Sequence, residues 1–284
     1  MYESFFGLRE PAFALTPDPR FLWLSETHEE GLAALFYGIT RRKGFILLTG
    51  EVGAGKTTLL RAAFDQIPAE TESAMVMNTA GLGPLDLLKL IAVELRIEGR
   101  LHSKVDYIIA LNAFLLERLE AGLNTVLIID EAQNLGPELL EEVRLLSNLE
   151  TGTVKLLQIV LTGQPELRRN LASAGLRQLR QRIAIEHHVE FLKPDQVASY
   201  LAYRIGVAGG RYEEVFAPGS EATFYAFSAG CPRLVSLLAD RVLLSAYGKG
   251  LRPVPPSLVD SKAKEMDAAR SEGLTEPIEL ELED

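Results

Sequence analysis

The stretch Gly50-Glu51-Val52-Gly53-Ala54-Gly55-Lys56-Thr57 decides how the rest of this sequence is interpreted. It fits the phosphate-binding pattern G-x-x-x-x-G-K-[ST] at every fixed position. An apolar run at residues 45–49 precedes it, and a helical pattern follows from Lys56 to about residue 66. This strand–loop–helix context is the one that the pattern requires, so the sequence predicts a loop that binds the phosphates of a nucleotide.

Each part of this loop has an expected role. The glycines allow backbone N–H groups to turn toward phosphate oxygens, and the following helix adds the partial positive charge of its N-terminus. Lys56 is expected to reach the β- and γ-phosphates, and the Thr57 hydroxyl to bind Mg²⁺. With ATP and Mg²⁺ as cofactors, the predicted binding residues are Gly50, Glu51, Val52, Gly53, Ala54, Gly55, Lys56, Thr57 and Thr58.

A second apolar run, residues 126–129, ends in Asp130-Glu131. A buried strand of a parallel sheet presents such residues at its carboxyl end, where ligands bind. Asp130 is expected to hold Mg²⁺ through its water shell, and Glu131 to polarise the attacking water as a general base. Two acids after an apolar run are weak evidence alone, but after a complete phosphate loop they indicate ATP hydrolysis.

Three further segments supply candidate catalytic side chains. Gln164 follows the expected fourth strand and is predicted to sense the γ-phosphate and the water, with Thr162 as the alternative. Arg233 begins an expected helix in Gly230-Cys231-Pro232-Arg233 and is predicted to contact the β/γ-phosphates, with a surface salt bridge as the alternative.

The third segment holds Arg177, Arg180 and Arg182, just before the expected fifth strand. An arginine supplied by a neighbouring subunit can stabilise a transferring phosphoryl group, because its charge is fixed and its planar fork fits phosphate oxygens. A solvated basic helix face and a contact with nucleic acid remain the alternatives for these three residues.

The alternation of strands and helices predicts an α/β fold with a doubly wound, largely parallel, five-stranded sheet. Strands are expected at residues 45–49, 74–77, 126–129, 156–161 and 183–189, with helices at 56–66, 84–95, 105–119 and 137–149. A further helix, capped by Ser25 or Thr27, is expected to run to about residue 39. After Pro194 only helices are expected, at 195–207, 220–228, 232–247 and 256–269. We therefore predict a core at residues 1–193, a helical lid at 194–270 and an acidic tail at 271–284. The first 24 residues, rich in aromatics and prolines, are expected to form an irregular strap within the core.

Composition narrows the class of protein. The 284 residues carry a net charge of −10, which lowers the expectation of a protein that grips duplex DNA. There is one cysteine, Cys231, so no intrachain disulfide is expected. No apolar stretch approaches the roughly 18–20 residues of a membrane span, and no signal peptide is recognised. The expected location is the cytoplasm, with peripheral attachment to the inner membrane through a partner as the alternative.

With these motifs in order, the chain resembles the AAA+ branch of P-loop proteins. More narrowly, it is similar to the ExeA/GspA-type secretion ATPases and to the related ATPases of exosortase and polysaccharide-export loci. Besides the phosphate loop, the segments that carry the resemblance are residues 2–8, 13–20, 130–135 (Asp-Glu-Ala-Gln-Asn-Leu), 163–167 (Gly-Gln-Pro-Glu-Leu), 179–183 and 230–233.

The resemblance implies more about the site. It implies a fourth strand lying between the strand before the phosphate loop and the strand that ends in Asp130. It implies an N-terminal strap that lines the adenine pocket, with Thr16, Pro17 and Asp18 as contacts. It also implies sensor 1 at Gln164, an arginine finger at Arg180 or Arg182, sensor 2 at Arg233, and ATP-dependent assembly into a homo-oligomeric ring or filament.

Two functions from different classes follow. The first is an ATPase that assists an envelope machine (secretion, pilus or polysaccharide export). Longer family members carry a transmembrane helix and a peptidoglycan-binding domain that do not follow here, so a membrane-protein partner is expected, with residues 276–284 as one possible docking segment. The alternative is a DNA-binding regulator similar to the MuB/TniB-type transposition ATPases, with Arg168, Arg169 and the Arg177–Arg182 cluster facing duplex DNA. A scaffold with little turnover is a third possibility, against which Glu131 argues.

Overall fold

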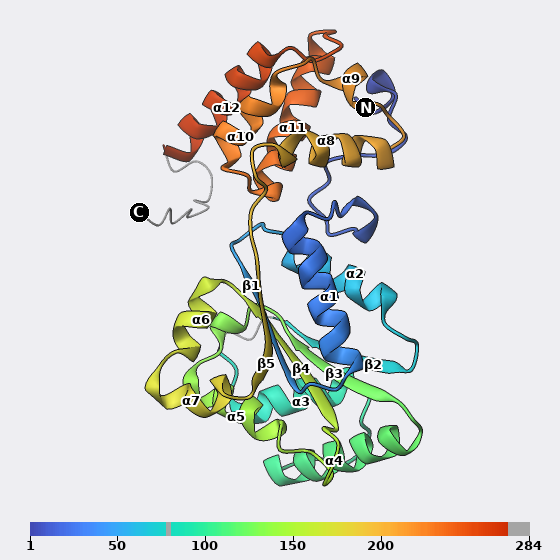
Figure 1. Ribbon diagram of the computed structural model, residues 1–284, viewed down its shortest axis with the longest axis vertical. Helices are drawn as coiled ribbons and strands as arrows, with labels where there is room; N and C mark the ends of the chain where they lie inside the picture. Colours follow the sequence, from blue (N-terminus) through green and yellow to red (C-terminus); the bar gives the residue numbers. More distant parts are fainter. Residues whose placement is uncertain (78–80, 272–284) are drawn as a thin grey trace. The chain divides into compact units, whose positions relative to one another are not determined.

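The computed structural model describes residues 1–77 and 81–271, which form two compact units (Figure 1). The sheet unit comprises Glu26–Glu51 and Leu59–Val189. The helical unit comprises Met1–Ser25, Val52–Thr58 and the chain from Glu190 onward. The phosphate loop therefore leaves the sheet unit after Glu51, and its residues Val52–Thr58 belong to the helical unit.

Five parallel strands form the sheet in the order β2-β3-β4-β1-β5. Their bounds are β1 Phe45–Gly50, β2 Thr71–Val76, β3 Asn124–Ile129, β4 Leu157–Gly163 and β5 Ile183–Val189. The three central strands β3, β4 and β1 are buried along their whole length, as their continuous apolar runs predict. The predicted position of the fourth strand, between β1 and β3, is confirmed.

Helices cover both faces of this sheet (Figure 1). Their bounds are α1 Glu26–Thr40, α2 Lys56–Gln66, α3 Pro84–Glu94, α4 Lys104–Glu120, α5 Pro137–Leu146, α6 Pro165–Leu171 and α7 Arg177–Arg180. Side chains of one sheet face, such as Leu47, Ile129 and Leu161, form a core with apolar residues of α3 to α7. On the other face α1 approaches closely: a Cβ added to Gly38 would lie 2.5 Å from Ile46 Cδ1.

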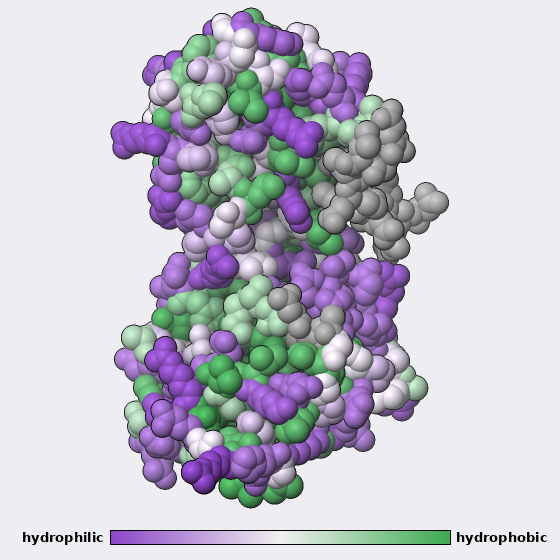
Figure 2. All heavy atoms as spheres, turned by 180° about the vertical axis from the view of Figure 1, so that it is seen from behind, coloured by the Kyte–Doolittle hydropathy of each residue, from purple (hydrophilic) through white to green (hydrophobic). Residues whose placement is uncertain are grey.

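Apolar side chains also reach the surface of the sheet unit. Apart from Met1, the most exposed large hydrophobic residues among those described are Val93 on α3 and Val105 and Ile109 on α4. Figure 2 shows hydrophobic side chains gathered over the sheet unit, in the lower half of the view. None of the described helices is long and apolar enough to cross a membrane.

The helical unit has its own core. Its elements are the 3₁₀ turns η1 Ser4–Phe6 and η2 Pro19–Phe21 and the helices α8 Gln196–Val207, α9 Tyr212–Val215, α10 Ser220–Ser228, α11 Pro232–Gly248 and α12 Pro256–Ser271. The strap aromatics Phe6, Phe13 and Phe21 are buried in this core with residues of α8, α10, α11 and α12. The strap therefore packs with the helices, whereas the sequence analysis grouped it with the sheet. The acidic residues 272–284 lie outside the described residues.

Candidate nucleotide site

The phosphate loop has the backbone geometry that its glycines allow. Gly53 and Gly55 have positive φ angles of 84° and 98°, which side-chain-bearing residues rarely adopt. Helix α2 begins at Lys56, directly after the turn, and the Lys56 side chain is buried. Such a turn at a helix N-terminus presents backbone N–H groups and a positive partial charge to one spot, so it fits the phosphates of a nucleotide.

The start of α11 packs directly on this loop. The backbone N–H of Arg233 donates to the Gly53 carbonyl at 3.4 Å, and the Cys231 thiol lies 3.6 Å from the Val52 carbonyl oxygen. A Cβ added to Gly53 would lie 2.8 Å from both Arg233 Cβ and Cys231 Sγ, so no side chain fits there. The structure thus brings together two motifs that lie far apart in the sequence, and it places the exposed Arg233 side chain beside the loop.

The same segment also contacts the chain that follows β5. Gly230 has a φ of 83°, and its carbonyl accepts a hydrogen bond from the Leu192 N–H at 3.0 Å. A Cβ at Gly230 would lie 2.0 Å from the Leu192 carbonyl oxygen. Residues 230–233 therefore join the linker after β5 to the phosphate loop, and glycine is required at the tightest point of that contact.

Two buried polar residues meet at the carboxyl ends of β3 and β4. Asp130 and Thr162 are 2% and 0% exposed, and the Thr162 hydroxyl donates to Asp130 Oδ1. The same oxygen accepts the backbone N–H of Glu131 at 3.0 Å. The strand register explains this meeting, because Ile129 and Leu161, the residues just before them, are paired. Thr162, which the sequence offered only as an alternative sensor, contacts the predicted metal-binding carboxylate.

Two side-chain amides donate hydrogen bonds to the Glu131 carboxylate. Gln164 donates from Nε2 to Glu131 Oε2 at 3.3 Å, so the predicted base and the predicted sensor are in contact. Gln133 donates to the same oxygen at 2.5 Å, although the sequence analysis gave it no role. What could have indicated Gln133 from the sequence is its position in the family segment 130–135, two residues after Glu131.

Two of the predicted site residues carry oxygen donors of the kind that suits Mg²⁺. The ion prefers hard oxygen ligands, and it commonly uses one or two protein groups together with phosphates and waters. The Asp130 carboxylate and the Thr57 hydroxyl are donors of this kind. No cluster of three or more His, Cys, Asp or Glu side chains occurs in residues 1–77 and 81–271, so an all-protein metal cage is not the arrangement found in that part of the chain.

Comparison with known proteins agrees with this geometry. Residues 39–171 match the AAA domain family. The chain is also 42% identical over 274 residues to General secretion pathway protein A of Aeromonas hydrophila, a match that covers 96% of this chain. The chain contains an AAA domain on an AAA+ P-loop fold. The predicted resemblance to the secretion ATPases is confirmed. The chain spans 50% of the length of that relative.

Solved structures of other AAA+ proteins share the fold. Aeropyrum pernix ORC2 matches with a TM-score of 0.67 at 16% identity, covering 90% of this chain and 71% of that one. Cdc6p of Pyrobaculum aerophilum matches with 0.67 at 20% identity, covering 89% and 70%. The RuvB branch migration motor of Thermotoga maritima matches with 0.59 at 16% identity, covering 85% and 69%. At these identities the likeness shows the fold alone.

The arginines selected from the sequence differ in their surroundings. Arg182 donates to Ser147 Oγ and to Asn148 Oδ1, both at 2.6 Å. Arg180, the last residue of α7, is exposed, and its side chain makes no hydrogen bond or ion pair to any residue that the structure describes. Of the two predicted finger residues, Arg180 is therefore the one whose guanidinium is available to another molecule.

The wider basic cluster is partly neutralised. Arg168 forms an ion pair with Glu186 at 2.7 Å, and Arg169 forms one with Glu166 at 2.7 Å. With Arg182 also bonded within the chain, three of the five arginines considered for duplex DNA have intramolecular partners. This arrangement weakens the case for a continuous phosphate-binding strip on this surface.

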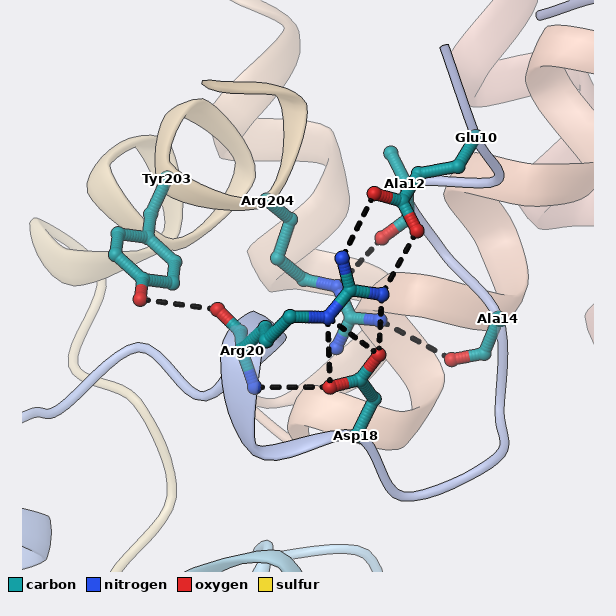
Figure 3. A network of polar contacts seen from close by, with 7 residues as sticks. All are labelled: Glu10, Ala12, Ala14, Asp18, Arg20, Tyr203 and Arg204. Carbon is teal, nitrogen blue, oxygen red and sulfur yellow. Dashed lines mark hydrogen bonds and ion pairs between the residues drawn. The ribbon is translucent and has the colours of Figure 1, made fainter. Parts of the chain in front are cut away.

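Arg204 of α8 fixes the path of the N-terminal strap (Figure 3). Its guanidinium donates to the Ala12 carbonyl at 2.7 Å and to the Ala14 carbonyl at 3.1 Å. It also lies over aromatic rings, at 5.9, 5.3 and 5.6 Å from the centroids of Phe13, Phe21 and Tyr200. One cation on α8 therefore holds the backbone and the buried rings of the strap together.

Arg20 closes the strap on itself (Figure 3). It pairs with Glu10 at 2.8 Å and with Asp18 at 2.7 Å, and its carbonyl accepts the Tyr203 hydroxyl at 3.1 Å. Its hydrogen bonds lower the pKa of the Glu10 carboxyl and of the Asp18 carboxyl below their usual values.

The three strap residues predicted to contact adenine lie in this loop. Thr16 is exposed, and Pro17 and Asp18 are half-buried. Asp18 also caps η2 by accepting the Arg20 N–H at 2.9 Å. That these residues line an adenine pocket stays a prediction.

Proposed function

We propose that this AAA+ protein binds ATP with Mg²⁺ and hydrolyses it to ADP and phosphate. The observation that carries the proposal is that one chain holds both a complete phosphate loop and, at the carboxyl ends of its sheet, the buried Asp130 and the amide-held Glu131. A phosphate loop alone supports nucleotide binding. The second carboxylate, placed directly after the first, supports hydrolysis.

In this proposal each residue of the site has its own role. Loop N–H groups and Lys56 hold the phosphates, while Thr57 and Asp130 hold Mg²⁺. The bound ion would neutralise charge on the phosphate oxygens. Glu131 accepts the proton of the attacking water, which raises the nucleophilicity of that water. Gln164 holds Glu131 in place, and Arg233 links the loop to α11.

We propose that catalysis is completed in an assembly of several copies. Arg180 is exposed at the end of a short helix, which suits insertion into the nucleotide site of a neighbouring copy. A guanidinium placed there would stabilise charge on the transferring phosphoryl group. Arg182 is less suited, because its donors are already satisfied by Ser147 and Asn148.

We further propose that the protein assists an envelope secretion machine through a membrane-protein partner. The support is the 42% identity to General secretion pathway protein A. Because this chain spans 50% of that relative, the partner and the process belong to the proposal.

The mass of the Glu131→Gln protein in solution tests this assignment. The substitution should preserve ATP binding while slowing turnover, so ATP-bound assemblies accumulate. We expect growth into a discrete ring when ATP and Mg²⁺ are added without DNA. Growth into open filaments only when duplex DNA is added would overturn the secretion assignment in favour of a nucleic-acid regulator.

A further inference from the structure

We propose that Gln133 is a positioning residue that anchors one oxygen of the Glu131 carboxylate and leaves the other to accept the proton of the attacking water. The inference rests on the proposed ATP hydrolysis and adds to it a residue outside the predicted set. It is carried by the contacts of Gln133, by the conformation of Glu131 and by the space beside Gly163.

The Gln133 amide has a fixed orientation. Gln133 lies in the 3₁₀ turn η3 (Ala132–Asn134), directly after Glu131, and it is half-buried. Its Oε1 accepts the backbone N–H of Gln164 at 3.1 Å. A backbone N–H can only donate, so the amide oxygen must face Gln164 and the amide nitrogen must face Glu131. The Gln133 side chain therefore spans from the end of β3 to the start of α6.

Gly163 provides the room for this span. A Cβ added at Gly163, the last residue of β4, would lie 2.6 Å from Gln133 Oε1. That distance is shorter than real contacts of this kind, so any larger residue would displace the Gln133 amide. The absence of a side chain at Gly163 thus leaves the space that the Gln133 amide occupies.

Both amide donors reach the same oxygen of Glu131. Gln133 Nε2 lies 2.5 Å and Gln164 Nε2 lies 3.3 Å from Oε2. Within residues 1–77 and 81–271, no hydrogen bond to Oε1 occurs. A carboxylate that acts as a general base needs one oxygen with an open lone pair. Oε2 is therefore the anchored oxygen and Oε1 the one available to the water.

The backbone of Glu131 is held in an unusual conformation. Its φ and ψ angles are 52° and 42°, in the left-handed region that residues other than glycine and asparagine seldom occupy. Such a conformation persists where the surroundings hold it, and it is found preferentially at functional sites. Gln133 contacts the Glu131 side chain and the backbone N–H of Gln164, directly after β4. These two contacts place Gln133 where it can hold Glu131 in this conformation.

Steady-state ATP hydrolysis by Gln133→Leu and Gln133→Glu tests the proposal. Gln133→Leu removes both hydrogen bonds. Gln133→Glu keeps the shape and an oxygen for the Gln164 N–H, but it places a second carboxylate beside Glu131. Both variants should lose roughly 10–100-fold in kcat, as groups that orient a reacting residue do, while KM stays within about twofold. Gln66→Leu, at the exposed last residue of α2, is the matched control and should keep the wild-type kcat.

A double-mutant cycle separates positioning from a general effect on the fold. In single-turnover assays, adding Gln133→Leu to Glu131→Gln should cause no further loss, because Gln133 acts through Glu131. An equal additional loss in that background would overturn the proposal, as would an unchanged or raised kcat in Gln133→Glu. Should Gln133→Leu fail to fold, Gln133→Glu decides the question.

The proposed function can fail separately. A wild-type protein no faster than Lys56→Ala would contradict ATP hydrolysis itself. An active wild type with an equally active Gln133→Glu would contradict only the role of Gln133.

Discussion

The hydroxyl of Thr162 donates to the carboxylate of Asp130, and the two side chains are buried side by side at the ends of adjacent strands. A buried threonine in a strand can serve only to pack against its neighbours. Its bond instead fixes the rotation of the carboxylate that we expect to hold Mg²⁺.

Thr162→Val should therefore impair catalysis more than stability. Valine has nearly the same shape but removes the Thr162 hydrogen bond to Asp130, and losing one such bond at a buried site costs about 1–3 kcal/mol. We expect ATP turnover to fall roughly 10–100-fold and the Mg²⁺ requirement to rise, as for other groups that orient a metal ligand. Thr162→Ser, which keeps the hydroxyl, is the control. Equal Mg²⁺ titrations for the two variants would argue against this role.

Gly53→Ala should weaken both folding and nucleotide binding. The added methyl meets Arg233 Cβ and Cys231 Sγ at 2.8 Å, on a backbone with a φ of 84°. Strain of this kind costs about 1–3 kcal/mol. Gly152→Ala is the control, because nothing lies within 4 Å of its Cβ position. Urea unfolding and nucleotide titration of both variants measure the difference, and identical curves would mean that the α11 contact with the loop is not tight.

Arg204→Leu should release the strap. It removes hydrogen bonds to the Ala12 and Ala14 carbonyls, and charged bonds of this kind contribute about 1.5–3 kcal/mol each. We expect faster amide exchange at residues 10–21 and weaker nucleotide binding. Arg211→Leu is the control, since it loses only an ion pair with Glu214 that is exposed and therefore screened by solvent. Unchanged exchange in Arg204→Leu would show that the aromatic core alone holds the strap.

Arg180→Ala and Arg182→Ala should fail in different ways. Arg182→Ala loses bonds to Ser147 and Asn148 and should unfold at a lower temperature. Arg180→Ala should keep its stability and ATP binding but lose turnover, because its guanidinium is expected to act on a neighbouring copy.

Mixing subunits tests the action in trans. Arg180→Ala subunits keep Glu131, and Glu131→Gln subunits keep Arg180. Mixed assemblies therefore contain complete sites and should recover part of the activity. Mixtures as inactive as their components would exclude a finger at Arg180.

Much of this architecture could be predicted from the sequence, because local patterns determine it. The apolar runs identified β1, β3 and β4, and the glycine loop fixed the start of α2 at Lys56. The short helices α6 and α9, of seven and four residues, were missed because they are too short to show a helical period.

The contacts that complete the site could not be predicted in the same way. Thr162 meets Asp130, and Gln133 meets Gln164, across 32 and 31 residues of sequence. Their meeting depends on strand register, which no local pattern specifies. The strap aromatics indicated burial but not the partner, since apolar surface on either unit would satisfy them.

Release of phosphate from ATP with Mg²⁺, measured alongside nucleotide binding for the wild type, Lys56→Ala and Glu131→Gln, tests the central claim most directly. We predict that the wild type binds and turns over ATP, that Glu131→Gln binds it with turnover reduced at least about 100-fold, and that Lys56→Ala does not bind it. Wild-type turnover in Glu131→Gln would contradict the assignment of Glu131 as the base and, with it, this account of the site.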